Sequence, residues 1–271
     1  MIKMGKAIGF IGAGNMGGAI IGGIVASGLY SAPDVIIYDK SPAAQKACTD
    51  KYGVTAAVSA PDAAAKADII FLAVKPNVLY DAIAEIRDYV KKDAVIVSIA
   101  AGQSIEKIEA AFGQKIKLMR VMPNTPALSG EGMSALSPNS LLDKDTAAKQ
   151  EIEKIFSSCG KAEFVAEKLM DAVTGVSGSS PAYVFMFIEA LADAAVMGGM
   201  PRNQAYTFAA QAVLGSAKMV LDTGLHPGAL KDMVCSPAGT TIEAVRVLEE
   251  RGLRSAVIEA VTACIEKSKQ M

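Results

Sequence analysis

The sequence predicts an α/β fold in which a doubly wound parallel sheet is followed by an all-helical C-terminal domain. Short β-branched runs alternate with amphipathic stretches in the first half of the chain. A GxGxxG motif follows the first of these runs, and no strand pattern appears after Glu167. We therefore expect a nucleotide-binding domain at residues 1–166 and a helical domain at residues 167–271.

The expected strands are short and apolar throughout, as is typical of a parallel sheet that is covered on both faces. An edge strand at Gly130–Ser137, a helix from about Lys144 to Ser158 and a last strand near Lys161–Val165 close the domain. The parallel strands are expected at Ala7–Ile11, Val35–Tyr38, Ile69–Val74, Ala94–Ile99 and Lys117–Val121.

The helical half carries apolar residues on more than one face of its first long helix, Ala182–Met200. A small isolated bundle could not bury them all, so we expect a homodimer formed through this domain. Glu189 and Asp193 interrupt the helix, and no uncharged run of about 18 apolar residues exists for a membrane span. We expect a buried helix of a soluble protein.

Charge and cysteine content exclude several classes of partner. Lys and Arg total 27 against 28 for Asp and Glu, so no net charge favours nucleic acid or an anionic membrane, and neither is expected as a partner. The four cysteines form no CxxC pair, which predicts reduced thiols and no metal site. Together with an N-terminus that lacks a signal-peptide pattern, this predicts a cytoplasmic protein.

The segment Ile11–Gly17 has the composition of a dinucleotide-binding turn between a strand and a helix, typical of a Rossmann domain. Gly12 would make the tight turn, Gly14 would let backbone N–H groups approach a pyrophosphate, and Gly17 would let the helix lie close to the strand. The helix N-terminus then faces the phosphates. The expected cofactor-binding residues here are Ile11, Gly12, Gly14, Asn15, Met16 and Gly17.

The adenosine end of the cofactor is expected beside the second strand. Asp39 stands about 20 residues beyond the glycine motif, where a carboxylate accepts hydrogen bonds from ribose hydroxyls, which favours NADH. Lys40 and Ser41 follow at once and could hold a 2′-phosphate, which favours NADPH. The sequence leaves NADH and NADPH as alternatives.

Two further strand ends point to the same edge of the sheet, because ligands of such sheets bind beyond the carboxyl ends of the strands. Small residues there would let the nicotinamide ribose approach the backbone. We expect cofactor contacts from Ala73, Val74, Lys75 and Pro76 after one strand, and from Ala100 and Ala101 after the next. The segment Met122–Pro126 would continue this wall.

Two segments of the helical half carry a family resemblance. Leu230–Ala244 (LKDMVCSPAGTTIEA) resembles the C-terminal signature of pyrroline-5-carboxylate reductases, and Val176–Tyr183 (VSGSSPAY) resembles a second motif of theirs. With GAGNMG, AVKP and MPNTP these matches cover the chain nearly end to end. The resemblance implies a helical dimerisation domain and an active site made where the two domains meet, partly from the partner subunit.

The family implies reduction of 1-pyrroline-5-carboxylate to L-proline by NADPH or NADH, the last step of proline biosynthesis, in a homodimer or a ring of dimers. It also implies that Thr241 is the catalytic residue, which exchanges a hydrogen bond with the ring nitrogen of the imine. The substrate-binding residues expected beside it are Ser236, Gly239, Thr240, Thr241 and Ser179.

The residues Gly239–Glu243 indicate a binding site for a carboxylate even without the family resemblance. Thr240-Thr241-Ile242-Glu243 after Gly239 has the form of a capping box, so a helix is expected to begin here. The free N–H groups of such a helix end would bind a carboxylate. The one histidine, His226, lies in a Gly-Leu-His-Pro turn and is expected to cap a helix.

Two departures and two rival functions bear on this hypothesis. Gly224 stands where some family members carry a substrate-contacting Glu, and Ala60 stands where a polar residue is common on the adenosine side. β-Hydroxyacid dehydrogenases share the glycine motif, but they place a catalytic lysine where Gly175–Ala182 has none, so alcohol oxidation lacks its general base. A non-catalytic sensor of the cofactor is disfavoured because it needs no second ligand site.

Overall fold

The computed structural model describes residues 6–271, which form two compact units. The first contains the residues up to Ser179 together with Cys264–Met271, and the second contains Ser180–Ala263. The segment between residues 167 and 179 thus belongs to the compact unit of the sheet. The division into compact units does not test the functional domain boundary expected at residue 166, which stays a prediction.

The first unit contains an eight-stranded sheet in the order β3-β2-β1-β4-β5-β6-β7-β8. The five expected parallel strands are confirmed, within two residues at each end, because their β-branched runs are buried on both faces. The chain adds β2 and then β3 (Thr55–Ala56) on one side of β1 and crosses to β4 on the other, and this reversal creates the crevice in which such sheets bind ligands. These strands are β1 (Ile8–Ile11), β2 (Val35–Tyr38), β4 (Ile69–Leu72), β5 (Val95–Ser98) and β6 (Lys117–Met122).

The far side of the sheet differs from the expectation. The strand expected at the edge, β7 (Gly132–Pro138), is interior: it pairs antiparallel with β6 and parallel with β8 (Gly160–Phe164), which forms the edge. The expected helix is α7 (Thr146–Ser157), preceded by a separate short helix, α6 (Ser140–Asp143). The opposite edge strand, β3 (Thr55–Ala56), was not expected because two residues show no periodicity.

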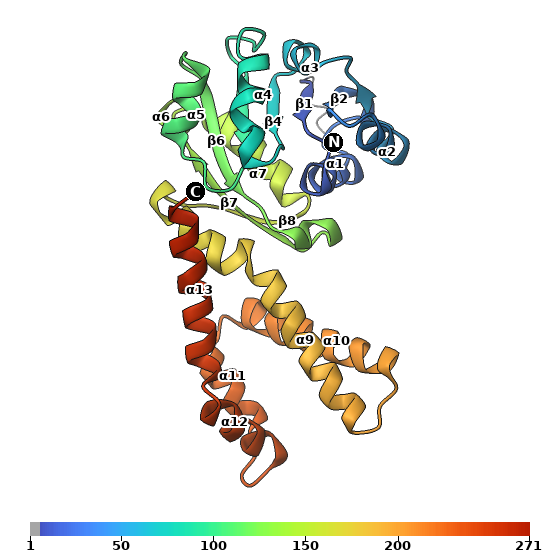
Figure 1. Ribbon diagram of the computed structural model, residues 1–271, viewed down its shortest axis with the longest axis vertical. Coiled ribbons are helices and arrows are strands. Elements are labelled where there is room, and N and C mark those ends of the chain that lie inside the picture. Colours follow the sequence, from blue (N-terminus) through green and yellow to red (C-terminus); the bar gives the residue numbers. More distant parts are fainter. Residues whose placement is uncertain (1–5) are drawn as a thin grey trace. The chain divides into compact units, whose positions relative to one another are not determined.

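Helices cover both faces of the sheet, and each face has its own apolar core (Figure 1). One face packs against α3 (Ala60–Lys66), α4 (Leu79–Ile86) and α5 (Ile105–Phe112). The other packs against α1 (Asn15–Ser27), α2 (Pro42–Tyr52) and α7. Short helical turns complete the unit at Ala32–Asp34, Pro76–Val78, Thr125–Ser129, Glu167–Leu169 and Met170–Val173 (α8).

The second unit is entirely helical, as expected: α9 (Ser180–Met197), α10 (Arg202–Thr223), α11 (Pro227–Val234), α12 (Thr240–Glu250) and most of α13 (Leu253–Lys269). Its own buried core is small, formed by Ala192, Ala205 and Ala209. Many large apolar side chains are exposed in the single chain, among them Phe185, Met186, Phe208, Leu221 and Ile258. Apolar helix faces of this kind are typical of an interface with another protein chain.

The run from Glu167 to Met197 is 31 residues long and, by length and composition, apolar enough to cross a membrane. Only 11% of its most apolar window is buried within the chain, so the expectation of a buried helix is wrong for the single chain. The physical reason is that α9 contacts chiefly α10 and leaves its other apolar faces open.

Candidate functional site

The turn after β1 requires glycine at two of its positions. Gly12 has a φ of 102°, and a Cβ there would lie 2.5 Å from the Ala73 carbonyl oxygen. A Cβ at Gly17 would lie 2.9 Å from the Gly12 carbonyl oxygen, so only glycine lets α1 start this close to the strand. The Gly12 N–H donates to the Tyr38 carbonyl (2.8 Å), which ties the turn to β2.

Gly14 differs from these two, because a Cβ there would meet nothing within 4 Å. It is exposed and precedes the first residue of α1, whose amino end has no side-chain cap among the described residues. Open space before the free N–H groups of a helix suits a phosphate group. The residues present therefore fit the pyrophosphate of a dinucleotide.

A cavity of about 360 Å³ adjoins the glycine turn and lies between the ends of β2 and β4. Tyr38, Val78, Ala82 and Glu85 also line it and were missed from the sequence; only the polar face of amphipathic α4 could have indicated Glu85. Ala60, which the sequence analysis placed on the adenosine side, lines the cavity as well. The expected cofactor residues that line it are Ile11, Gly12, Gly14, Asp39, Lys40, Ala73, Val74 and Lys75.

The remaining expected residues lie outside this cavity. Asn15 lines a separate cavity between α1 and α2, and Ser41 caps α2 by accepting a hydrogen bond from the Ala44 N–H (3.3 Å). Ala100 is buried, and its N–H is 3.5 Å from the Ser98 hydroxyl oxygen at the end of β5. Neither cavity is lined by Met16 and Gly17, in the first turn of α1, or by Pro76 and Ala101, in the turns after β4 and β5.

Asp39 and Lys40 make different contacts at the end of β2. The Asp39 carboxylate accepts hydrogen bonds from the N–H groups of Ala13 (2.7 Å) and Ser41 (2.8 Å). The Lys40 ammonium lies 2.7 Å from the Glu85 carboxylate, and this contact raises the pKa of Lys40. Asp39 thus braces two loops, whereas Lys40 is held by an exposed ion pair.

Asn124, in the segment Met122–Pro126, was not singled out by the sequence. Its side-chain amide donates to the Ser177 carbonyl (3.1 Å), and its side-chain oxygen accepts from the Met133 N–H (2.8 Å). Ser177 lies in one turn of π-helix at Thr174–Gly178, where such turns often accompany function. Asn124 therefore joins the end of β6 and strand β7 to the turn that precedes Ser179.

We expect Asn124→Ala to lower the free energy of unfolding by about 1–3 kcal/mol, because the buried side chain satisfies two backbone groups at once. Urea denaturation of the purified protein measures the loss. Ser129→Ala, at an exposed residue whose hydroxyl donates to the nearby Pro126 carbonyl, is the control and should change stability by less than about 0.5 kcal/mol. Equal effects of the two substitutions would contradict the role of Asn124.

Helix α12 begins at Thr240 within the segment Leu230–Ala244, but the expected capping box does not form. Gly239 precedes the helix and has no side chain, and the Glu243 carboxylate instead pairs with the Arg246 guanidinium (2.8 Å), which lowers the pKa of Glu243. Among the described residues no side chain caps α12, so its amino end can receive an external anion. Thr241, the second residue of the helix, is half-buried.

A tight turn leads into this helix. Gly239 donates its N–H to the Ser236 carbonyl (3.1 Å), and Ala238 adopts a left-handed conformation with a φ of 56°. Such a conformation costs a non-glycine residue roughly 1–2 kcal/mol, so the turn is held against a local preference. The predicted substrate residues Ser236, Gly239, Thr240 and Thr241 are thus brought together, whereas Ser179 lies in the other unit, where its hydroxyl accepts from the Cys264 thiol (3.1 Å).

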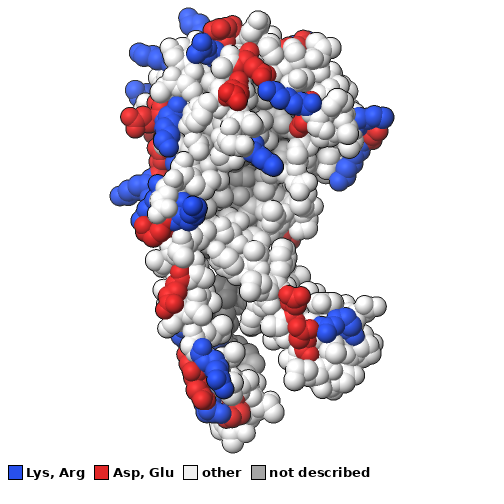
Figure 2. All heavy atoms as spheres, in the orientation of Figure 1, with Lys and Arg blue, Asp and Glu red and all other residues white. Residues whose placement is uncertain are grey.

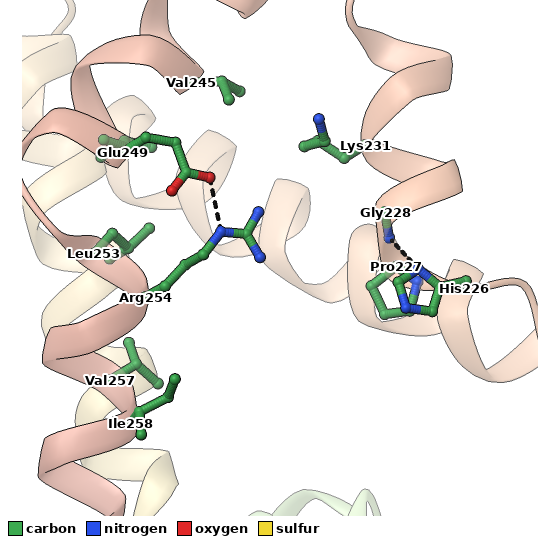
Figure 3. A pocket seen from close by; sticks show the side chains of 11 residues that line it. His226, Pro227, Gly228, Lys231, Val245, Glu249, Leu253, Arg254, Val257 and Ile258 are labelled. Carbon is green, nitrogen blue, oxygen red and sulfur yellow. Dashed lines mark hydrogen bonds and ion pairs between the residues drawn. The ribbon is translucent and has the colours of Figure 1, made fainter.

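His226 precedes α11, and its Nδ1 accepts from the Gly228 N–H (3.0 Å), which confirms the expected helix-capping role. Gly224 ends α10 in a left-handed conformation (φ 64°), and no carboxylate stands at that position. The helical unit also has a cavity of about 730 Å³, drawn in Figure 3, lined by α11, α12 and α13. None of the predicted substrate residues lines it.

Comparison with known proteins decides the family. The chain is 57% identical over 268 residues to the pyrroline-5-carboxylate reductase of Escherichia coli, with 99% of both sequences covered. The chain belongs to the pyrroline-5-carboxylate reductase family. The protein of that name from Methanosarcina acetivorans is 43% identical and covers 98% of both sequences. The family's dimerisation model, described as "Pyrroline-5-carboxylate reductase dimerisation", matches residues 167–271.

A solved structure supports the same family. The Plasmodium falciparum pyrroline carboxylate reductase, determined with NADP bound, superimposes with a TM-score of 0.90 at 33% identity and covers 99% of this chain and 98% of its own. Residues 7–102 match a second model, described as "NADP oxidoreductase coenzyme F420-dependent". The resemblance seen in the sequence is confirmed, and the rival β-hydroxyacid dehydrogenase family is set aside.

Proposed function

We propose that this chain is a pyrroline-5-carboxylate reductase, which reduces the imine bond of 1-pyrroline-5-carboxylate to give L-proline. The observation that carries the proposal is the 57% identity to a reductase of that name over nearly the whole of both chains. At that identity the glycine turn, the strand ends and the α12 segment are all within the matched length. The cofactor is NADH or NADPH.

The residues of the glycine turn would hold the pyrophosphate, since Gly14 leaves the space open and α1 offers uncapped N–H groups. The turn Ser236–Gly239 and the first residues of α12 would hold the substrate carboxylate in the same way. When bound, the reduced nicotinamide supplies the hydride that adds to the imine carbon.

Thr241 would act at the ring nitrogen of the imine. Its hydroxyl can donate or accept one hydrogen bond there, and the nitrogen keeps the electron pair that the C=N bond releases. A protonated cyclic imine is already electrophilic, so the protein has chiefly to orient two rings and exclude water. No strong general acid is needed, which agrees with the capping role of the one histidine, His226.

We further propose that residues 1–166 form the nucleotide-binding domain and that residues 167–271 form the domain for dimerisation and substrate. A dimerisation domain is present, and the exposed apolar faces of α9, α10 and α13 supply a reason for a homodimer or a ring of dimers.

We also propose a cytoplasmic location, because the four free cysteines suit a reducing compartment. Lys and Arg are interspersed with Asp and Glu on the face seen in Figure 2, so nucleic acid and membranes are not proposed as partners.

The test is a steady-state assay of the purified protein with 1-pyrroline-5-carboxylate and each reduced cofactor, with proline as the measured product. We expect cofactor oxidation that depends on the substrate and an equal amount of proline. A 3-hydroxy acid with oxidised cofactor is the parallel assay for the rival dehydrogenase. Turnover of the hydroxy acid, or no formation of proline, would reject the proposal.

A further inference from the structure

We infer that Asp39 makes this protein prefer NADH to NADPH. The inference rests on the proposed function, which requires a reduced dinucleotide, and it decides between the two cofactors that the proposal leaves open. NADPH differs from NADH only in the phosphate on the 2′-oxygen of the adenosine ribose. Rossmann domains place that ribose at the end of the second strand, which here is Asp39.

The position of the Asp39 carboxylate is fixed by the backbone on two sides. One oxygen accepts from the Ala13 N–H of the glycine turn (2.7 Å), and the other accepts from the Ser41 N–H (2.8 Å). The backbone N–H of Asp39 itself donates to the Gln45 side chain (3.0 Å). Each carboxylate oxygen keeps a further lone pair, so Asp39 can still accept from a ribose hydroxyl without leaving its place.

The same contacts remove what a 2′-phosphate would need. Phosphate groups at such loops are held by backbone N–H groups and by basic side chains. The Ser41 N–H is already bonded to Asp39, and the Ser41 hydroxyl oxygen accepts from the Ala44 N–H. The chain's own carboxylate therefore occupies the donor that a phosphate would use.

The charged side chains that line the cavity also favour NADH over NADPH. Its lining holds two carboxylates, Asp39 and Glu85, and two ammonium groups, Lys40 and Lys75, so it has no positive excess to balance a phosphate of about two negative charges. Lys40 is already paired with Glu85. Ala60 adds only a methyl group where α3 meets the cavity.

Of the two lysines in the lining, Lys40 directly follows Asp39, and it could reverse this preference because its ion pair with Glu85 is exposed and weak. If Lys40 left Glu85 for a phosphate, the phosphate would still lie beside the fixed Asp39 carboxylate. Like charges at close range in a partly enclosed site oppose binding strongly. Asp39, rather than Lys40, is therefore expected to decide the preference.

The test measures binding without substrate. The dissociation constants of NADH and NADPH for the full-length protein are obtained from the fluorescence of the reduced nicotinamide. We expect NADH to bind at least about tenfold more tightly than NADPH, and Asp39→Asn to shift the ratio of the two constants toward NADPH by about tenfold or more. Asp50→Asn is the matched control, since it removes one exposed carboxylate of α2 that does not line the cavity, and it should leave the ratio unchanged.

A second variant keeps Asp39 in place and so does not depend on the folding of the first. Glu85→Gln releases Lys40 from its ion pair and should strengthen NADPH binding by less than about tenfold, with NADH still preferred. Tighter binding of NADPH to the unmodified protein, or a reversal of preference by Glu85→Gln, would overturn the inference. Failure to reduce 1-pyrroline-5-carboxylate would instead reject the proposed function and leave this binding ratio as it is.

Discussion

Gly14→Val is expected to weaken dinucleotide binding by about 100-fold or more while the fold survives. A Cβ at Gly14 meets no protein atom within 4 Å, so valine side-chain atoms would enter only the space assigned to the pyrophosphate. The backbone at Gly14 has a φ of −68°, which valine adopts without strain. Titration of the protein with NADH or NADPH measures the loss, and thermal unfolding measures the stability.

Two glycines of the same segment make this result specific. Gly18→Ala also places a Cβ in open space on α1 but does not line the cavity at the ends of β2 and β4, so dinucleotide affinity should be retained. Gly12→Ala forces a Cβ against the Ala73 carbonyl at a positive φ, so it should lower stability itself. Unchanged affinity in Gly14→Val would show that the phosphates lie elsewhere.

Thr241→Ala is expected to lower kcat/KM for the imine roughly 5- to 30-fold, which corresponds to a loss of transition-state stabilisation of about 1–2 kcal/mol. The reason is the removal of one hydrogen bond to the reacting ring. Because Thr241 belongs to the helical unit and does not line the cavity beside the glycine turn, the dissociation constant of the dinucleotide should not change. Steady-state kinetics and cofactor titration of the same preparation measure both quantities.

Two further variants separate the effect of the Thr241 hydroxyl from the effect of its side-chain volume. Thr241→Ser keeps the hydroxyl and should retain most of the activity, whereas Thr241→Val keeps the volume and should behave like Thr241→Ala. If serine and valine had the same effect, the contribution of Thr241 would be packing at the start of α12 rather than a hydrogen bond.

The nucleotide-binding half was largely predictable because its signals are local. Buried strands of a parallel sheet consist of continuous β-branched runs, and the turn after β1 needs glycine at particular positions, as the contacts of Gly12 and Gly17 explain. The placement of β7 was wrong because it depends on pairing with β8, which lies more than twenty residues further along the chain. No periodicity within β7 carries that information.

The candidate site was predictable in part. The capping box at α12 was wrong because Glu243 has a nearer partner in Arg246, one turn further along the same helix. Asn124 was missed because its two backbone partners lie in other elements, Met133 in β7 and Ser177 in the π-helical turn 53 residues further along the chain. The hypothesis that the glycine turn and Thr241 serve one reaction rests on the family, since they belong to different compact units.

The most direct test of the account is the destination of the transferred hydrogen. The purified protein is given 1-pyrroline-5-carboxylate and NADH that carries deuterium at the transferable position of the nicotinamide. We predict proline with a deuterium on the ring carbon that was double-bonded to nitrogen, detected by mass spectrometry and NMR. Unlabelled proline, deuterium on another carbon, or no proline would contradict hydride transfer to the imine carbon.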